Sequence, residues 1–255
     1  MVAVPAIIFA IFVVAWGGAV FTLAAAALGL ICLHELFTMY ERARPVRLAA
    51  TLGVIGLAVA AHFGGPDEVM LATIVSIPLV FVCGLLVKGE KLHTAGMSIT
   101  VLGLTWIGLA IAHSILLRNL PHGDGIMIDV LVGTFAGDTA AYLGGRAFGS
   151  RKLAPTVSPN KTVEGLAIGV VTAVIATWCA GLYQDWLGHG QALLLGLAVG
   201  LAAPLGDLLE SKVKRDAGVK DAGKLFGAHG GALDRLDAAL FALIAGYYVW
   251  KAMLG

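Results

Sequence analysis

Four carboxylates lie within or at the ends of the late apolar stretches of the sequence, where charged residues are rare: Asp138, Asp207, Glu210 and Asp234, with Asp237 one turn beyond the last. Asp207 and Glu210 are three positions apart, and so are Asp234 and Asp237, so each pair lies on one face of a helix. A charge inside an apolar span costs about 2.5–3.5 kcal/mol and needs a partner, a cation or water. Carboxylates of this kind suit Mg²⁺, which completes its shell with water and substrate phosphates.

Basic residues accompany these carboxylates. Ser211 and Lys214 continue the helical face of Asp207 and Glu210, and a basic, glycine-rich loop at 212–231 joins the two stretches. Lysine and arginine beside a metal would bind phosphates, so the pattern indicates phosphoryl or nucleotidyl transfer. The alternative is that the carboxylates form ion pairs that serve packing alone. A serine hydrolase is not expected, because the sequence has no Gly-x-Ser-x-Gly motif.

Glycines and histidines supply weaker signals. Backbone amides of Gly144-Gly145 or Gly230-Gly231 could approach a phosphate, but glycine also permits close helix packing, which we favour for either pair taken alone. His229 could contact a phosphate or protonate a leaving group, or be structural. His34 and Glu35 could cap or pair locally, or line a lipid-headgroup entrance, and we favour the structural interpretation.

The elements that position these residues are expected to be membrane helices. Hydrophobic residues make up 59% and charged residues 13% of the 255 residues, with a mean hydropathy of +0.91, whereas a soluble domain is roughly a quarter charged. In water the surface would be one hydrophobic patch, so the bilayer must be the solvent. The three cysteines lie apart in apolar stretches and predict neither disulfides nor a zinc site.

Nine apolar spans are expected, each near the roughly 20 residues that a bilayer requires. The first two meet at Trp16-Gly17-Gly18, as a tight hairpin or one broken element. With the N-terminus in the cytoplasm, fifteen of the 17 lysine and arginine residues fall on the inner side, a strong positive-inside bias. The fold predicted is an all-α polytopic bundle with the C-terminus outside. The spans lie at 3–16, 18–40, 46–63, 68–87, 95–117, 126–145, 163–183, 191–211 and 232–253.

No repeat or linker divides the chain, which predicts a single membrane domain over residues 1–255. Residues 1–125 would be a scaffold with dimer or lipid contacts, and residues 126–255 would carry the catalytic helices and cytoplasmic loops. The N-terminus has no basic region typical of a signal peptide, so we expect a bacterial inner (plasma) membrane protein. A secondary transporter is a less favoured alternative, since repeated halves are absent from the sequence, and no nucleic-acid partner is expected.

Residues 211–237 resemble the signature of the CDP-diacylglycerol synthase (phosphatidate cytidylyltransferase) family. Residues 137–146, 158–165 and 206–211 resemble further motifs of that family, and the resemblance extends over about 130–250. Gly227, where the family often has proline, and Ala232, where a larger apolar residue is expected, are departures that concern packing. The signature positions, all at the family's spacing, are Ser211, Lys214-Arg215, Lys220-Asp221, His229-Gly230-Gly231, Asp234-Arg235 and Asp237.

The resemblance implies an enzyme that makes CDP-diacylglycerol and pyrophosphate from phosphatidic acid and CTP. It implies Mg²⁺, with a monovalent cation such as K⁺ as a further candidate, and a homodimer whose site opens to the cytoplasm. The metal-binding residues would be Asp207 and Asp234, with Glu210 and Asp237 as further candidates. The catalytic candidates are Lys161, Lys214, Arg215, Lys220, Asp221, His229 and Arg235. The substrate-binding candidates are Asp138, Ser158, Ser211, Gly230 and Gly231.

The lipid acceptor is the least determined part of this interpretation. A cytidylyltransferase for another lipid, such as an archaeal ether lipid, or a CTP-dependent polyprenol kinase stays open. Phosphatidate is a phosphate monoester whose second pKa is about 6, so it is already an anion near neutral pH. Catalysis would therefore rest on alignment and charge neutralisation, with His229 as a phosphate contact or loop-shaping residue and not an obligatory base.

Overall fold

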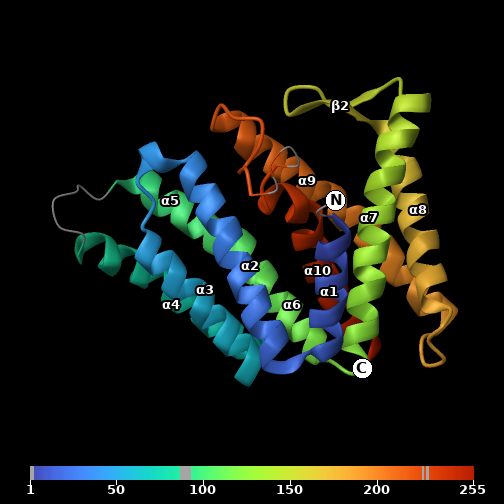
Figure 1. Cartoon of the computed structure of the whole chain (residues 1–255), viewed down its shortest axis with the longest axis horizontal. Helices are drawn as coiled ribbons and strands as arrows, with labels where there is room; N and C mark the ends of the chain where they lie inside the picture. The colour runs from blue at the N-terminus through green and yellow to red at the C-terminus, as the bar shows by residue number, and fades with distance from the viewer. Residues whose placement is uncertain (1–2, 87–92, 226, 228–229) are drawn as a thin grey trace. The chain divides into compact units, whose positions relative to one another are not determined.

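The computed structural model describes residues 3–86, 93–225, 227 and 230–255, and it has an all-α architecture with one small β-hairpin (Figure 1). The elements are α1 (Ala3–Trp16), α2 (Gly18–Met39), η1 (Glu41–Ala43), α3 (Arg47–Phe63), α4 (Pro66–Leu86), α5 (Thr94–Gly103), η2 (Leu104–Gly108), α6 (Leu109–Asn119), α7 (Gly123–Phe148), β1 (Lys152–Ala154), β2 (Ser158–Thr162), α8 (Val163–Gly181), α9 (His189–Asp216) and α10 (Leu233–Met253). The predicted all-α class is confirmed.

Every apolar range found in the sequence contains a helix. Among the described residues, seven helical segments are long and apolar enough to cross a membrane. One of them, Thr94–Asn119, joins α5, η2 and α6 without a break. The helices α1 and α3 are shorter, with 14 and 17 residues. The lengths and compositions of these helices fit a multi-pass membrane protein, whereas the count of nine spans stays a prediction.

The first two helices are separate elements. Gly17 lies between α1 and α2 with a φ of 69°, in the left-handed region that favours glycine. A Cβ atom at Gly17 would also collide with the guanidinium group of Arg118. Arg118 donates from Nε to the carbonyl oxygen of Val14 at 2.6 Å, where its positive charge complements the C-terminal end of α1. The junction thus depends on the positive φ of Gly17, and Arg118 caps the end of α1.

The chain forms two compact units. The first comprises residues 1–119 with 219–235, where α3 packs against α2, α4 and α6. The second comprises residues 120–218 with 236–255, where α8 packs against α7 and α9. Most of the loop that carries the family signature thus belongs with the N-terminal helices. The predicted division of roles between residues 1–125 and 126–255 stays a prediction.

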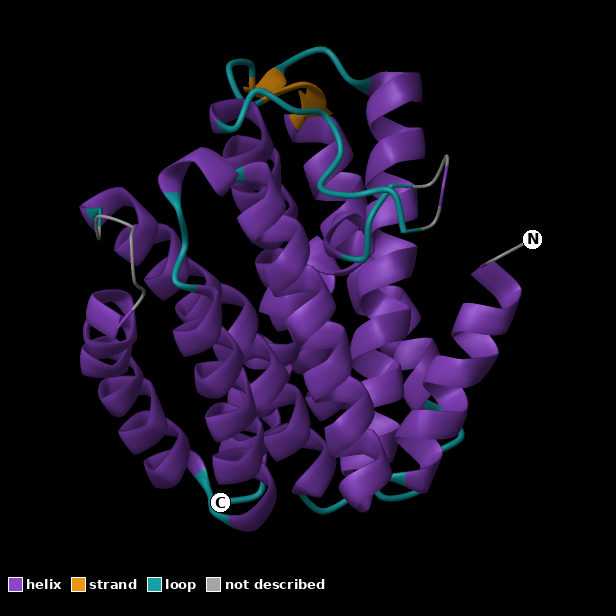
Figure 2. Cartoon of the chain, turned by 60° about the vertical axis from the view of Figure 1, so that its left-hand side comes forward, coloured by secondary structure: helices purple, strands orange, loops and turns teal. Residues whose placement is uncertain are grey.

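Glycines bring α7 and α8 close together. A Cβ atom at Gly137 would lie 3.1 Å from the carbonyl oxygen of Gly169, and one at Gly169 would lie 2.9 Å from that of Gly137. Gly144 lies against Ile168 in the same way, which agrees with the packing role favoured for it. The antiparallel hairpin β1–β2, which the sequence did not predict, connects these two helices at one end (Figure 2).

Candidate functional site

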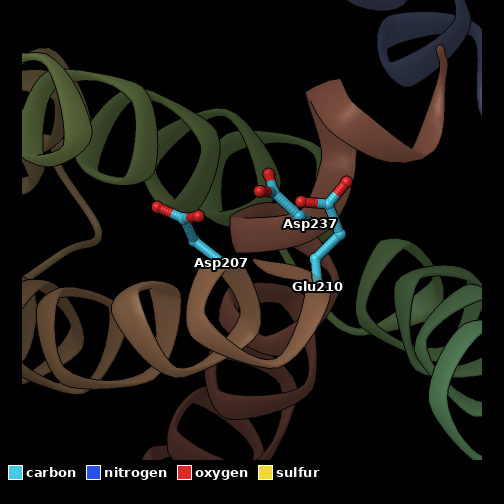
Figure 3. Close-up of side chains that lie close together, drawn as sticks. All are labelled: Asp207, Glu210 and Asp237. Atoms are coloured by element: carbon cyan, nitrogen blue, oxygen red, sulfur yellow. The ribbon is translucent and has the colours of Figure 1, made fainter. Parts of the chain in front are cut away.

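Three of the predicted metal-binding residues form a carboxylate cluster in the second unit. Asp207 and Glu210 of α9 and Asp237 of α10 each offer one oxygen, and these oxygens all lie within 4.8 Å of one another (Figure 3). Glu210 is buried, with 1% of its surface exposed, and the two aspartates are half-buried. Gly206 allows this approach, because a Cβ atom there would collide with the carbonyl oxygen of Asp237.

Two lysines pair with the carboxylate cluster. Lys161, near the end of β2, forms an ion pair with Asp207, and Lys214 forms one with Glu210 one helical turn earlier. Ser211 lies at the limit of hydrogen-bond distance from Asp207, with 3.5 Å between Oγ and Oδ1. Three carboxylates and two ammonium groups leave a net negative charge when all are ionised. Hard oxygen donors with an excess of negative charge fit a divalent cation such as Mg²⁺.

Glu164 holds the hairpin that delivers Lys161. Its carboxylate accepts the backbone N–H groups of Ser150 and Arg151, each at 3.1 Å, and the Ser150 hydroxyl at 2.8 Å. It also forms an ion pair of 3.2 Å with Arg151. Thr162 caps α8 by accepting the N–H of Gly165 at 3.1 Å. These bonds fix both ends of the hairpin, and they thereby hold Lys161 of β2 near Asp207 of α9.

Asp234 organises the signature loop in the first unit. Its Oδ2 atom accepts the backbone N–H groups of Ala222 at 2.9 Å and Gly231 at 2.8 Å. Gly230 precedes this contact with a φ of 80°, a conformation that glycine adopts without strain. The glycine pair therefore has a clear structural role at this turn. The predicted metal-binding role of Asp234 stays a prediction.

Glu35 anchors the same loop to α2. The side chain is 6% exposed, and its carboxylate accepts the backbone N–H groups of Ala232 at 3.0 Å and Leu233 at 2.8 Å. The first N–H groups of a helix have no partner within that helix, and they favour a negative charge. A Cβ atom at Gly223 or Gly231 would collide with this carboxylate. Glu35 therefore caps the start of α10, which is distant in the sequence, and does not cap or pair locally as the sequence interpretation expected.

The other predicted site residues lie at the surface of their own units. Arg215 is exposed in the last turn of α9, and Asp138 is exposed on α7. Ser158 is half-buried at the start of β2. The roles proposed for all of them stay predictions, and His229 lies outside the described residues. The exposed candidates in the first unit are Lys220, Asp221 and Arg235.

Comparison with known proteins identifies the family. Residues 1–253 match the Cytidylyltransferase family. The chain is also 34% identical over 256 residues to the phosphatidate cytidylyltransferase of Bacillus subtilis (strain 168), which covers 96% of this chain and 93% of that protein. The chain belongs to the cytidylyltransferase family. The family predicted from the signature residues is thereby confirmed, and so is the expectation of an enzyme of this type.

Two other relatives are longer proteins. The uncharacterized protein YnbB of Escherichia coli (strain K12) is 39% identical over 178 residues, which are 67% of this chain and 59% of that protein. Phosphatidate cytidylyltransferase 4, chloroplastic, of Arabidopsis thaliana is 32% identical over 236 residues, which are 88% of this chain and 57% of that protein. The chain therefore spans less than two thirds of these two relatives.

Proposed function

We propose that this member of the cytidylyltransferase family transfers a cytidylyl group from CTP to phosphatidic acid, giving CDP-diacylglycerol and pyrophosphate in phospholipid biosynthesis. The observation that carries the proposal is the carboxylate cluster of Asp207, Glu210 and Asp237 with its two lysines, in a chain of this family. The name of the Bacillus subtilis relative supports phosphatidic acid as the acceptor.

The reaction needs charge neutralisation more than proton removal. A phosphate oxygen of phosphatidic acid attacks the α-phosphorus of CTP, and the bond between that phosphorus and the oxygen leading to the β-phosphorus breaks to release pyrophosphate. Because the second pKa of a phosphate monoester is about 6, the attacking group is an anion near neutral pH. The protein must therefore align two anions that repel each other, and fixed positive charges lower the barrier most where negative charge develops.

The carboxylate cluster could supply this positive charge by holding a metal ion. Asp207, Glu210 and Asp237 would hold Mg²⁺, which supplies positive charge to the phosphates of CTP when it is bound. Asp234 and a monovalent cation such as K⁺ belong to the same proposal through the family resemblance. The distances and charges of the cluster fit such an ion.

Lys161 and Lys214 would act on the phosphates directly. Both side chains are mostly buried, with 26% and 15% exposed, and each neutralises a carboxylate of the cluster. A cation bound by the carboxylates would compete with these ion pairs and release the ammonium groups toward the phosphates. Lysine is a common phosphate ligand because its charge is compact.

We further propose nine spans, with the N-terminus in the cytoplasm, the C-terminus outside and the site facing the cytoplasm of a plasma membrane. The distribution of lysine and arginine along the sequence supports this orientation. The basic residues at the site, on β2, at the end of α9 and in the signature loop, all lie on the predicted inner side. A homodimer is part of the proposal through the family resemblance.

The proposal is tested with purified protein in detergent, CTP and Mg²⁺, by following pyrophosphate release. Phosphatidic acid should support turnover well above that with an archaeal ether-lipid phosphate, and a polyprenol should yield no phosphorylated product. Release that depends equally on another lipid phosphate would keep the chemistry and change the acceptor. Production of polyprenyl phosphate and CDP would reassign the chain as a lipid kinase.

A further inference from the structure

A groove of about 590 Å³ lies in the first unit, between α2 and the signature loop. Its lining includes Leu30, Ile31, His34 and Thr38 on α2, with Lys224 and Leu225 across from them. All of these residues belong to one compact unit. The groove lies beside the carboxylate of Glu35, which anchors the loop.

The lining changes from apolar to polar along α2. Leu30 and Ile31 come first, and His34 and Thr38 follow one and two turns later. At a rise of 1.5 Å per residue, Leu30 and Thr38 are about 12 Å apart along the helix. Ile31 and Leu225 are exposed, as are His34 and Lys224. The groove thus offers an apolar surface at one end and polar groups at the other, as a ligand with a tail and a head requires.

The polar side chains in the lining are suited to an anion. Lys224 contributes an ammonium group, and Arg47 donates from Nη1 to His34 Nδ1 over 3.3 Å. Because arginine only donates, Nδ1 of His34 is the acceptor, and the Nε2–H of the neutral ring is available as a donor. Glu35 also lines the groove, but its carboxylate already accepts two backbone N–H groups. The exposed polar groups here are therefore mainly donors.

We propose that this groove binds the lipid acceptor, an anionic phospholipid with a phosphate monoester head. The phosphate lies at Lys224 and His34, and an acyl chain lies along Leu30, Ile31 and Leu225. This inference rests on the proposed function and extends it, because it places the second substrate next to the loop that Glu35 holds.

Kinetics with groove variants test the assignment. Lys224→Ala removes the charge at the head, Ile31→Trp fills the apolar end, and Leu23→Trp is the matched control because Leu23 is 71% exposed on the same helix outside the groove. We expect the KM for phosphatidic acid to rise about tenfold in each groove variant, while the KM for CTP and the control stay within about twofold of wild type. An unchanged KM for phosphatidic acid in both groove variants would overturn the assignment.

The same experiment separates this inference from the proposed function. Wild-type protein with no turnover on phosphatidic acid contradicts the proposed function itself. Normal wild-type turnover with unaffected groove variants contradicts only the groove. Lys224→Ala keeps the test decisive if Ile31→Trp does not fold, because Lys224 is exposed and has little packing to lose.

Photolabelling distinguishes a substrate from ordinary bilayer lipid. Phosphatidic acid and phosphatidylcholine, each with a photoreactive acyl chain, are bound to the protein in nanodiscs and crosslinked. We expect phosphatidic acid to label the peptide containing residues 30–38, and unlabelled phosphatidic acid to compete. Equal labelling by phosphatidylcholine would show that the groove takes any bilayer lipid and would contradict the proposal.

Discussion

The carboxylate of Glu35 accepts the backbone N–H of Leu233 at 2.8 Å, although 198 positions separate the two residues. This bond joins α2, in the part of the chain expected to be scaffold, to the first residue of α10. The loop with the family signature directly precedes α10. The N-terminal helices therefore take part in shaping the signature loop, through a buried carboxylate whose two oxygens each accept one backbone N–H.

Replacing Glu35 with glutamine should impair turnover. Glutamine keeps one acceptor oxygen and replaces the other with an NH2 group, which cannot accept a hydrogen bond. The backbone N–H of Ala232 or Leu233 therefore loses its acceptor while buried, at a cost of about 1–3 kcal/mol. We expect kcat to fall at least about tenfold, with a lower thermal stability of the detergent-solubilised protein. Glu68→Gln is the control, since exposed Glu68 accepts one backbone N–H, that of Gly65, at 2.7 Å. Equal behaviour of the two variants would remove the anchoring role of Glu35.

Gly223→Ala tests the same anchor from the other side. The added methyl group would collide with the Glu35 carboxylate, which cannot move without losing its bonds to the loop. We expect a loss of turnover similar to that of Glu35→Gln. Gly56→Ala, in exposed surroundings on α3 where a Cβ atom meets nothing within 4 Å, should be stabilising by up to about 1 kcal/mol. A fully active Gly223→Ala protein would show that the contact is not needed.

The carboxylate cluster should be essential for catalysis and dispensable for folding. Asp207→Asn and Asp237→Asn keep the size of each side chain and remove one negative charge, so we expect kcat to fall by about 10²–10³. The measurement is pyrophosphate release over a range of Mg²⁺ concentrations, with extraction and melting temperature as folding checks. Asp185→Asn, at an exposed position, is the matched control. Activity in the cluster variants equal to that of the control would exclude them from the metal site.

Lysine and histidine variants separate charge neutralisation from base catalysis. Lys161→Ala removes an ammonium group held at the cluster, and we expect a loss of about a hundredfold in kcat. His229→Gln keeps a hydrogen-bond donor and should retain measurable turnover, because the phosphate nucleophile needs no base. The opposite ranking, with an inactive His229→Gln protein and a nearly normal Lys161→Ala protein, would indicate a histidine-centred mechanism.

The orientation in the membrane is tested by a reporter at the C-terminus. The asymmetry of lysine and arginine puts Gly255 on the outer side when the N-terminus is inside. A fusion partner that is active only in the cytoplasm should therefore give no signal at Gly255, while the same partner inserted at 152–158, in the hairpin, should give one. A strong signal at Gly255 would contradict the odd number of spans.

Local sequence patterns predicted the helices and the chemistry of the cluster. The apolar ranges matched helices, because a bilayer requires long apolar segments whatever their neighbours are. The spacing of Asp207 and Glu210 placed both on one face of α9, and the structure adds Asp237 from α10. These inferences depend on helix periodicity and on the cost of burying charge, both of which act over a few residues.

Contacts between distant segments could not be predicted in the same way. Nothing near Glu35 in the sequence indicates that it bonds Ala232 and Leu233, and an acid inside a span gives no direction toward its partner. The bonds of Glu164 to Ser150 and Arg151 were also not predictable from the sequence. They depend on a hairpin that is too short to show an alternating apolar pattern. The contact of Asp234 with the signature loop was equally hidden, because nothing in the local sequence indicates that its carboxylate accepts the backbone N–H of Ala222.

Direct detection of the product tests the central claim most closely. Purified protein is incubated with CTP, Mg²⁺ and phosphatidic acid of defined acyl chains, and the lipids are analysed by mass spectrometry beside an Asp207→Asn sample. The account predicts CDP-diacylglycerol with the same acyl chains and an equal amount of pyrophosphate from the wild-type protein, and almost none from the variant. Absence of CDP-diacylglycerol with folded wild-type protein, or equal amounts from both proteins, would contradict it.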